Sequence, residues 1–156
     1  MKKELTPSQA LSRAAAWCSR GERCTADVRA KLDAWGLGGE DAGAVMDALA
    51  ADGYVDDLRY AKAFANDRAR LSGWGRVKIA YALRAKGIGD AAVREALDGV
   101  DDDDYAASMD KAMSAKARQM SEDDHARRRA KLIRFGVSRG YDYGAVSRWV
   151  EEHDGR

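Results

Sequence analysis

Residues 79–88 read IAYALRAKGI, and two related stretches stand elsewhere in the chain, VRAKLDAWGL at 28–37 and RRAKLIRFGV at 128–137. Each has an apolar residue four places before a glycine and another directly after it. A glycine that ends an amphipathic run is the usual helix stop, because it reaches the left-handed conformation without a Cβ clash. The glycines are spaced by 51 and 49 residues and are Gly36, Gly87 and Gly136. This spacing predicts a repeat of about 50 residues.

The same period appears on both sides of these stretches. Downstream, apolar pairs four residues apart predict the buried face of a further helix. These pairs are Val45 and Leu49, Val93 and Leu97, and Val146 and Val150. Upstream, two sets of residues recur every 47 positions: Leu11, Leu58 and Tyr105, and Cys18, Ala65 and Ala112. Each repeat should therefore hold three helices.

The sequence thus predicts an all-α protein of three tandem three-helix repeats, arranged as an elongated, curved array of right-angled bundles. We expect the repeats to span residues 1–53, 54–100 and 101–156. One repeat of this size buries little core, so stacking between repeats should supply further stability. The predicted helix starts lie near Ser8, Thr25, Gly39, Asp57, Gly75, Asp90, Asp104, Glu122 and Asp142.

Side chains that can cap a helix stand at or near most of these starts. A capping oxygen accepts a hydrogen bond from an unpaired backbone N–H in the first turn. Ser121 is also followed three residues later by Asp124, which resembles a capping box. The expected caps are Thr25, Asp57, Asp90, Asp104, Ser121 and Asp142.

Composition agrees with a helical globular chain. Of 156 residues, 46% are hydrophobic, 34% are charged, and only Pro7 is a proline. Two cysteines cannot build a disulfide scaffold, and no apolar stretch approaches the roughly 18 residues of a membrane span. The first ten residues, MKKELTPSQA, lack the apolar core of a signal peptide. We therefore expect a cytoplasmic protein that does not associate with membranes.

The formal net charge of +1 hides strong segregation along the chain. Residues 40–57 carry six acids and no base, and residues 90–110 carry eight acids and one base. By contrast, residues 57–86 hold eight bases and two acids, and residues 111–139 hold nine bases and three acids. A basic surface of this kind would hold a polyanion such as DNA through its phosphates. Solvated helix faces are the alternative explanation for any one cluster.

Two basic clusters occupy comparable places in successive repeats and form the candidate nucleic-acid or filament interface. Trp74, in a glycine-flanked turn beside the first cluster, is a candidate for stacking on a base. The first cluster is Arg68, Arg70, Arg76, Lys78, Arg84 and Lys86, and the second is Arg127, Arg128, Arg129, Lys131 and Arg134. No base-reading motif accompanies them, so binding should be largely insensitive to DNA sequence.

No residue pattern indicates catalysis, a metal or a cofactor. Cys18 shares a repeat position with two alanines and should be a small, inert core residue, whereas Cys24 should lie at a turn. His125 and His153 are far apart in sequence and surrounded by charge. The four aspartates of 101–104 are better explained as a linker that ends in a helix cap than as a cation site. No glycine-rich phosphate loop is present. We therefore expect a protein that is not an enzyme.

Residues 52–88 contain two successive motifs. The first has an apolar pair, two acids, an arginine, an aromatic and an alanine, then an aromatic and a basic residue, and it consists of Tyr54, Val55, Asp56, Asp57, Arg59, Tyr60, Ala61, Phe64 and Arg68. The second has a glycine, a basic pair around an apolar residue and a helix end, and it consists of Gly75, Arg76, Lys78, Ile79, Leu83, Lys86, Gly87 and Ile88. Together they resemble the RecX family of regulators of the RecA recombinase. The stretch SRGERCTADVRAKLDAWGL at 19–37 is similar to the N-terminal unit of the family, and the resemblance covers most of the chain.

This resemblance implies a non-enzymatic regulator, acting in homologous recombination, DNA repair and the SOS response. Such proteins bind the RecA–single-stranded DNA filament in its groove and inhibit its extension, ATP hydrolysis and strand exchange. The resemblance also implies a monomer without cofactors. The alternative is a helical DNA-binding protein that acts without RecA, such as a transcriptional regulator. That function needs a recognition helix with base-reading side chains, and Asn and Gln are scarce here.

Overall fold

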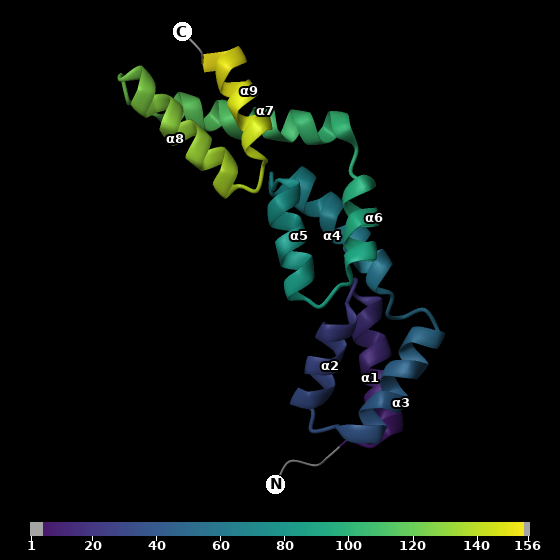
Figure 1. Ribbon diagram of the computed structural model, residues 1–156. Coiled ribbons are helices and arrows are strands. Elements are labelled where there is room, and N and C mark those ends of the chain that lie inside the picture. The colour runs from purple at the N-terminus through teal and green to yellow at the C-terminus, as the bar shows by residue number, and fades with distance from the viewer. Residues whose placement is uncertain (1–4, 155–156) are drawn as a thin grey trace.

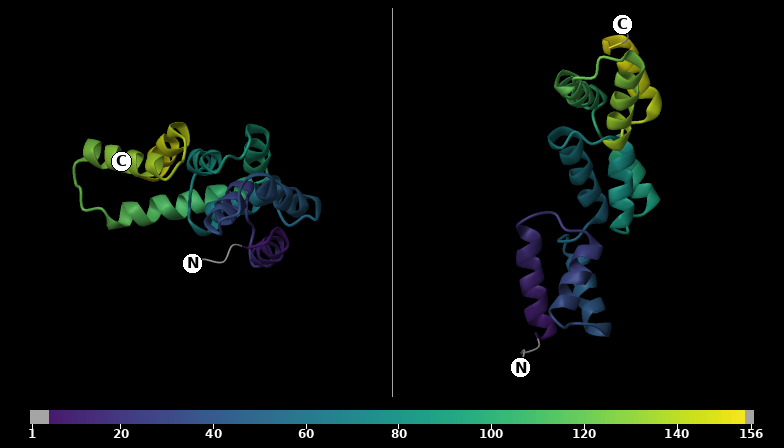
Figure 2. Two further views of the ribbon diagram at one scale, coloured as in Figure 1. Left: turned by 90° about the horizontal axis from the view of Figure 1, so that it is seen from below. Right: turned by 90° about the vertical axis from the view of Figure 1, so that its left-hand side faces the viewer.

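The computed structural model describes residues 5–154, and this part of the chain folds into nine α-helices without any strand. The helices follow one another in three groups of three along an elongated molecule (Figure 1). The first and the last helix lie at opposite ends, as the side view in Figure 2 also shows. The prediction of an all-α array of three-helix repeats is confirmed.

Each group forms one unit of the array. The first unit contains α1 (Pro7–Ser19), α2 (Thr25–Ala34) and α3 (Gly39–Ala51). The second contains α4 (Asp57–Leu71), α5 (Arg76–Ala85) and α6 (Asp90–Asp98). The third contains α7 (Asp102–Gln119), α8 (His125–Ser138) and α9 (Tyr143–Asp154). Every predicted helix start agrees with these bounds to within three residues. The proposed unit boundaries at 53/54 and 100/101 fall in connections between the groups and stay a prediction.

Each unit encloses its own apolar cluster. In the first unit Leu32 and Leu49 are fully buried, and in the second Leu83 and Val93 are at least 99% buried. Tyr141 is 1% exposed in the cluster of the third unit. Burial of one such side chain stabilises a fold by roughly 1.5–3 kcal/mol. Two side chains connect these clusters at the junctions, because Cys24 and Tyr105, from the first and third units, also pack against the cluster of the second unit.

Most of the predicted helix caps are wrong by one to three positions. Asp142 caps α9 as predicted, since its carboxylate accepts a hydrogen bond from the Ala145 N–H at 3.0 Å. Elsewhere the N-cap is the residue directly before the first helical turn. Its side chain accepts a backbone N–H at Asp56, Asp101 and Asp124, whereas Cys24 makes no side-chain capping bond and Gly89 has no side chain. The observed N-caps in place of Thr25, Asp57, Asp90, Asp104 and Ser121 are Cys24, Asp56, Gly89, Asp101 and Asp124.

The predicted helix stop at Gly136 is also wrong. Gly136 lies inside α8, and the left-handed residue after this helix is Gly140, with φ of +96°. The Tyr141 N–H donates to the Gly136 carbonyl, just as Leu37 and Ile88 donate to the carbonyl five residues earlier in the other units. The equivalent glycines are therefore Gly36, Gly87 and Gly140. A side chain at Gly136 would bring Cβ within 2.7 Å of the Val146 methyl groups, so this glycine serves close helix packing.

Backbone groups form much of the junction between the second and third units. The Gly75 N–H donates to the Arg139 carbonyl at 2.7 Å, and the Val77 N–H donates to the Gly140 carbonyl at 3.0 Å. The Tyr141 hydroxyl donates to the Gly73 carbonyl at 2.8 Å. This close approach is possible because Gly75 and Gly140 face each other without side chains. These bonds join the α4–α5 loop to the α8–α9 loop.

The junction between the first and second units is built differently, from carboxylates. Asp57 accepts from the Thr25 N–H at 2.7 Å, and Lys86 pairs with Asp27 at 2.6 Å. Burial alone would raise the pKa of Asp27, but hydrogen bonds from Lys86 and Cys24 hold that pKa below its usual value. Cys24 packs into the apolar cluster of the second unit. Charge pairing and one buried side chain thus hold this junction.

The two cysteines reverse their expected environments. Cys24 precedes a helix as predicted but is fully buried, whereas Cys18 is only half-buried. Burial raises the pKa of both thiols, which keeps them protonated near neutral pH. The prediction that Cys18 is inert is therefore supported by its pKa, but the prediction that it is buried is only partly correct.

We expect Ellman's reagent to distinguish these thiols. In the native protein Cys18 should react slowly and Cys24 only after unfolding, so one thiol per chain is titrated before denaturant and two after it. A Cys18→Ser variant should lose nearly all native reactivity. Immediate reaction of two thiols in the folded wild type would contradict the burial of Cys24.

Candidate nucleic-acid interface

Six of the eleven basic residues in the predicted interface are already paired with carboxylates of the same chain. The sequence had assigned all six to binding a polyanion. The pairs are Arg76 with Asp102 at 2.9 Å, Arg84 with Asp90 at 3.3 Å, Lys86 with Asp27 at 2.6 Å, Arg128 with Asp154 at 2.8 Å, Arg129 with Glu151 at 3.7 Å, and Lys131 with Glu122 at 3.1 Å. A phosphate would have to compete with a carboxylate at each of these positions.

Among these six residues, Arg76 makes the most contacts with a neighbouring unit. Its guanidinium lies over the ring of Tyr105, 4.1 Å from the centroid, and its backbone N–H donates to the Tyr105 hydroxyl at 2.9 Å. The same side chain reaches Asp102 at the start of α7. Arg76 therefore links α5 of the second unit to the third unit, which is a structural role.

Trp74 is half-buried against the apolar cluster of the second unit. Its ring packs edge-on against Phe64, with centroids 6.1 Å apart. The Lys78 ammonium lies 4.6 Å from the Trp74 centroid, and the Arg68 guanidinium lies 5.9 Å from it. The structure therefore places two of the predicted basic residues beside the ring of Trp74, and it leaves this ring less accessible than its glycine-flanked turn suggested.

The second basic cluster is directed mainly toward α9. Arg128 pairs with Asp154 and also donates to the Ala117 carbonyl at 2.9 Å. Arg129 donates to the Ser147 hydroxyl at 3.2 Å and lies 3.7 Å from Glu151. Arg127 is exposed. Arg128 and Arg129 thus hold the third unit together.

A small hollow at the junction of the second and third units gathers basic side chains from three elements. Arg70 comes from α4, Lys111 from α7, and Arg139 follows α8. Its volume is about 210 Å³, and we call it the junction hollow. The described residues that line it include no acid and are Arg70, Leu71, Ser72, Gly73, Ser108, Lys111, Ala112, Ala115 and Arg139.

The guanidinium of Arg139 is held in place within this hollow. It donates to the Ser72 carbonyl at 2.9 Å and lies over the Phe135 ring, 5.6 Å from the centroid. Its Nε is buried, and no residue between 5 and 154 accepts a hydrogen bond from it. No carboxylate of the described residues forms an ion pair with Arg70 or Lys111. Three unneutralised cations and a serine hydroxyl suit an anion of the size of a phosphodiester.

Sequence reasoning found Arg70 but missed Lys111 and Arg139. Both residues are among the nine bases of residues 111–139, but neither belongs to the two clusters that the sequence predicted as the interface. What brings them to Arg70 is the junction of the two units, which no local pattern encodes.

Other kinds of site find no support in the part of the chain that the structure describes. No group of three potential metal-ligating side chains converges there. Among the described helices, none is long and apolar enough to cross a membrane.

Comparison with known proteins places the chain among regulators. Residues 56–97, which cover α4 to α6, match the family model described as RecX, second three-helix domain. Over 129 residues the chain is 35% identical to the regulatory protein RecX of Chromohalobacter salexigens, covering 82% of each chain. It is 34% identical over 143 residues to the regulatory protein RecX of Thermus thermophilus, covering 91% of each.

Solved structures share the architecture. The crystal structure of RecX from Lactobacillus salivarius superposes with a TM-score of 0.84 at 20% identity, over 96% of this chain and 97% of that one. A second crystal structure of regulatory protein RecX gives a TM-score of 0.82 at 22% identity, over 96% and 73% of the two chains. The fold is therefore that of RecX crystal structures. Taken with the sequence identities, these likenesses show that the chain is a regulatory protein, not an enzyme, and belongs to the RecX family.

Proposed function

We propose that this protein binds the filament that the RecA recombinase forms on single-stranded DNA and inhibits filament extension, ATP hydrolysis and strand exchange. The observation that carries the proposal is sequence likeness to regulatory RecX proteins, 30% identical over 92% of the chain in one case. A regulator of this kind needs no catalytic group of its own. It acts by binding one state of the filament more tightly than another.

Within this proposal, single-stranded DNA is held through its phosphates. The junction hollow is the first contact point, because Arg70, Lys111 and Arg139 lie together there without a neutralising acid. Lys78 and Arg68, beside Trp74, extend the basic surface within the second unit. The recognition is independent of base sequence, since phosphate contacts carry no sequence information.

The elongated shape supports a partner that is itself extended. Three units in a row present separate surfaces along one axis, so contacts can spread over several neighbouring subunits of a filament (Figure 1). Acidic stretches such as 40–57 repel phosphate and would face protein rather than DNA. We propose that the chain acts as a monomer.

Hydrolysis of ATP by RecA on circular single-stranded DNA tests this function. We expect the wild-type protein, added at well below one molecule per RecA, to lower the rate progressively as filaments turn over. Hydrolysis by RecA without added protein is the reference. If the rate stays unchanged at every ratio up to one to one, the proposed function is wrong.

A further inference from the structure

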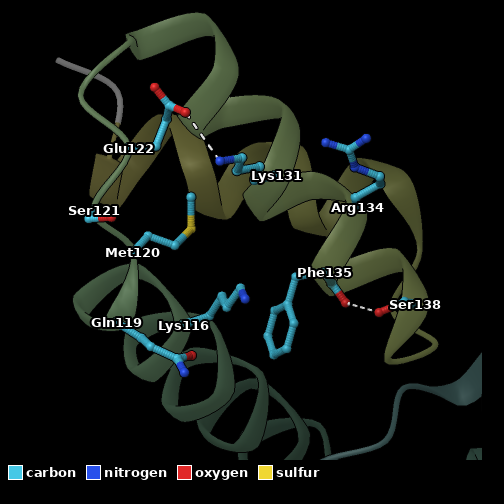
Figure 3. A pocket seen from close by; sticks show the side chains of 9 residues that line it. All are labelled: Lys116, Gln119, Met120, Ser121, Glu122, Lys131, Arg134, Phe135 and Ser138. Carbon is cyan, nitrogen blue, oxygen red and sulfur yellow. Dashed lines mark hydrogen bonds and ion pairs between the residues drawn. The ribbon is translucent and has the colours of Figure 1, made fainter.

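A larger hollow lies in the third unit, between the C-terminal half of α7 and α8 (Figure 3). Its volume is about 700 Å³, which lies within the range of small-molecule and peptide sites. We call it the α7–α8 cleft. It is lined by Lys116, Gln119, Met120, Ser121, Glu122, Lys131, Arg134, Phe135 and Ser138.

The walls of the cleft combine apolar and basic groups. Met120 and Phe135 direct a thioether and a ring into it, and the ammonium groups of Lys116 and Lys131 enter from α7 and α8 respectively (Figure 3). Arg134 stands at its rim. Glu122 is the one acid among the described lining residues, so cations outnumber acids by three to one. The cleft therefore favours an anionic ligand that also carries an apolar group.

The connection between α7 and α8 places one apolar and one acidic side chain of the protein at this cleft. The segment between α7 and α8 puts Met120 against the cleft and lets Glu122 accept a hydrogen bond from Lys131 at 3.1 Å. The bond from Lys131, and a second from the Asp124 N–H, hold the pKa of Glu122 below its usual value, so this carboxylate is ionised near neutral pH. One end of the cleft thus already holds an apolar side chain and a carboxylate, those of Met120 and Glu122.

We infer that the α7–α8 cleft binds an acidic peptide segment of a protein partner. Carboxylates of the segment bind Lys116, Lys131 and Arg134, and an apolar side chain between them packs on Met120 and Phe135. The flexible thioether of Met120 adapts to different apolar side chains. Glu122 competes for Lys131 and therefore weakens the binding.

A nucleotide fits the cleft less well than a peptide. The ammonium of Lys116 and the guanidinium of Arg139 already lie over the Phe135 ring, at 5.5 and 5.6 Å from its centroid. A base would have to displace a cation before it could stack. A phosphate alone would fill only a small part of the volume, and the junction hollow matches its size better.

Fluorescence anisotropy with a fluorescein-labelled synthetic decapeptide tests this inference in the absence of RecA, so its failure is separate from failure of the proposed function. The peptide alternates aspartate and glutamate around two central leucines. We expect the peptide to bind the full-length protein saturably. Its Kd for the Lys116→Ala/Lys131→Ala variant should be about ten times higher. Lys62→Ala, on α4 of the second unit, should bind as the wild type does.

Three further arms keep the test decisive. Glu122→Gln should bind the peptide severalfold more tightly, because Lys131 loses its internal carboxylate, and a misfolded variant could not give that gain. A peptide with lysines in place of the acids should not bind, and one with serines in place of the leucines should bind more weakly. Equal binding by wild type and double variant would overturn the inference. A second outcome would also overturn it: the double variant binds a ten-nucleotide oligo-dT more weakly, Lys62→Ala does not, and peptide binding is unchanged in both.

Discussion

Replacement of Gly75 by alanine should lower the free energy of unfolding by about 3 kcal/mol, because the junction between the second and third units has no room for a methyl group. A Cβ at this position would overlap the backbone carbonyl of Gly140. Backbone atoms cannot move aside as a flexible side chain can, so the two loops must separate. Their separation also breaks the bond from the Gly75 N–H to the Arg139 carbonyl. In a chain of this size the midpoint of thermal unfolding should fall by about 10 °C.

Gly87→Ala is the matched control for this prediction. Gly87 has φ of +78°, so alanine there is strained, yet nothing lies within 4 Å of an added Cβ. This variant should lose only about 1 kcal/mol, the usual cost of the backbone conformation alone. Circular dichroism during thermal unfolding measures the loss of stability in both variants. Equal losses in the two variants would mean that the junction yields easily and does not join the units as described.

Replacement of Arg70 and Lys111 together by alanine should weaken binding to oligo-dT and flatten its dependence on salt. Each phosphate neutralised on a single strand contributes a slope of about 0.7 in the plot of log affinity against log salt, so two lost contacts remove about 1.4. Both side chains are exposed and no described acid pairs with them, so the fold should be unaffected. Anisotropy titrations between low and moderate salt measure the slope.

Two other variants separate DNA binding from stability. Lys62→Ala removes one exposed cation of the second unit and should leave the slope unchanged. Arg76→Ala should lower thermal stability, because it loses Asp102 and Tyr105, but should alter the slope little. A wild-type slope in the Arg70/Lys111 variant would show that the junction hollow does not contact phosphate.

The helices and their repeat could be predicted from the sequence because both follow from local patterns. The run from Leu83 to Ile88 contains a helix face, its glycine stop and the apolar residue that folds back, all within six positions. In the third unit the same reasoning selected Gly136, whereas the helix stop is Gly140. Both are glycines near the end of one helix, and only the packing of α9 against α8 distinguishes a close contact from a stop.

The charge pattern was harder to interpret because ion pairs form between distant segments. The six bases of 68–86 contain no acid between them, which favours an uninterrupted basic patch. In the fold, Arg76 and Lys86 meet Asp102 and Asp27, which belong to the neighbouring units. Part of the segregated charge therefore serves the junctions between units. The cations that remain available, such as Arg70, could not be distinguished without knowing those contacts.

ATP hydrolysis by RecA on single-stranded DNA, with the Arg70→Ala/Lys111→Ala variant beside the wild type and Lys62→Ala, tests the central claim most directly. That claim is that the protein restrains the filament partly through phosphate contacts at the junction of its second and third units. We predict that wild type and Lys62→Ala inhibit alike, and that the double variant, folded by circular dichroism, needs several times more protein for the same inhibition. Inhibition by the double variant at wild-type concentrations would contradict the claim.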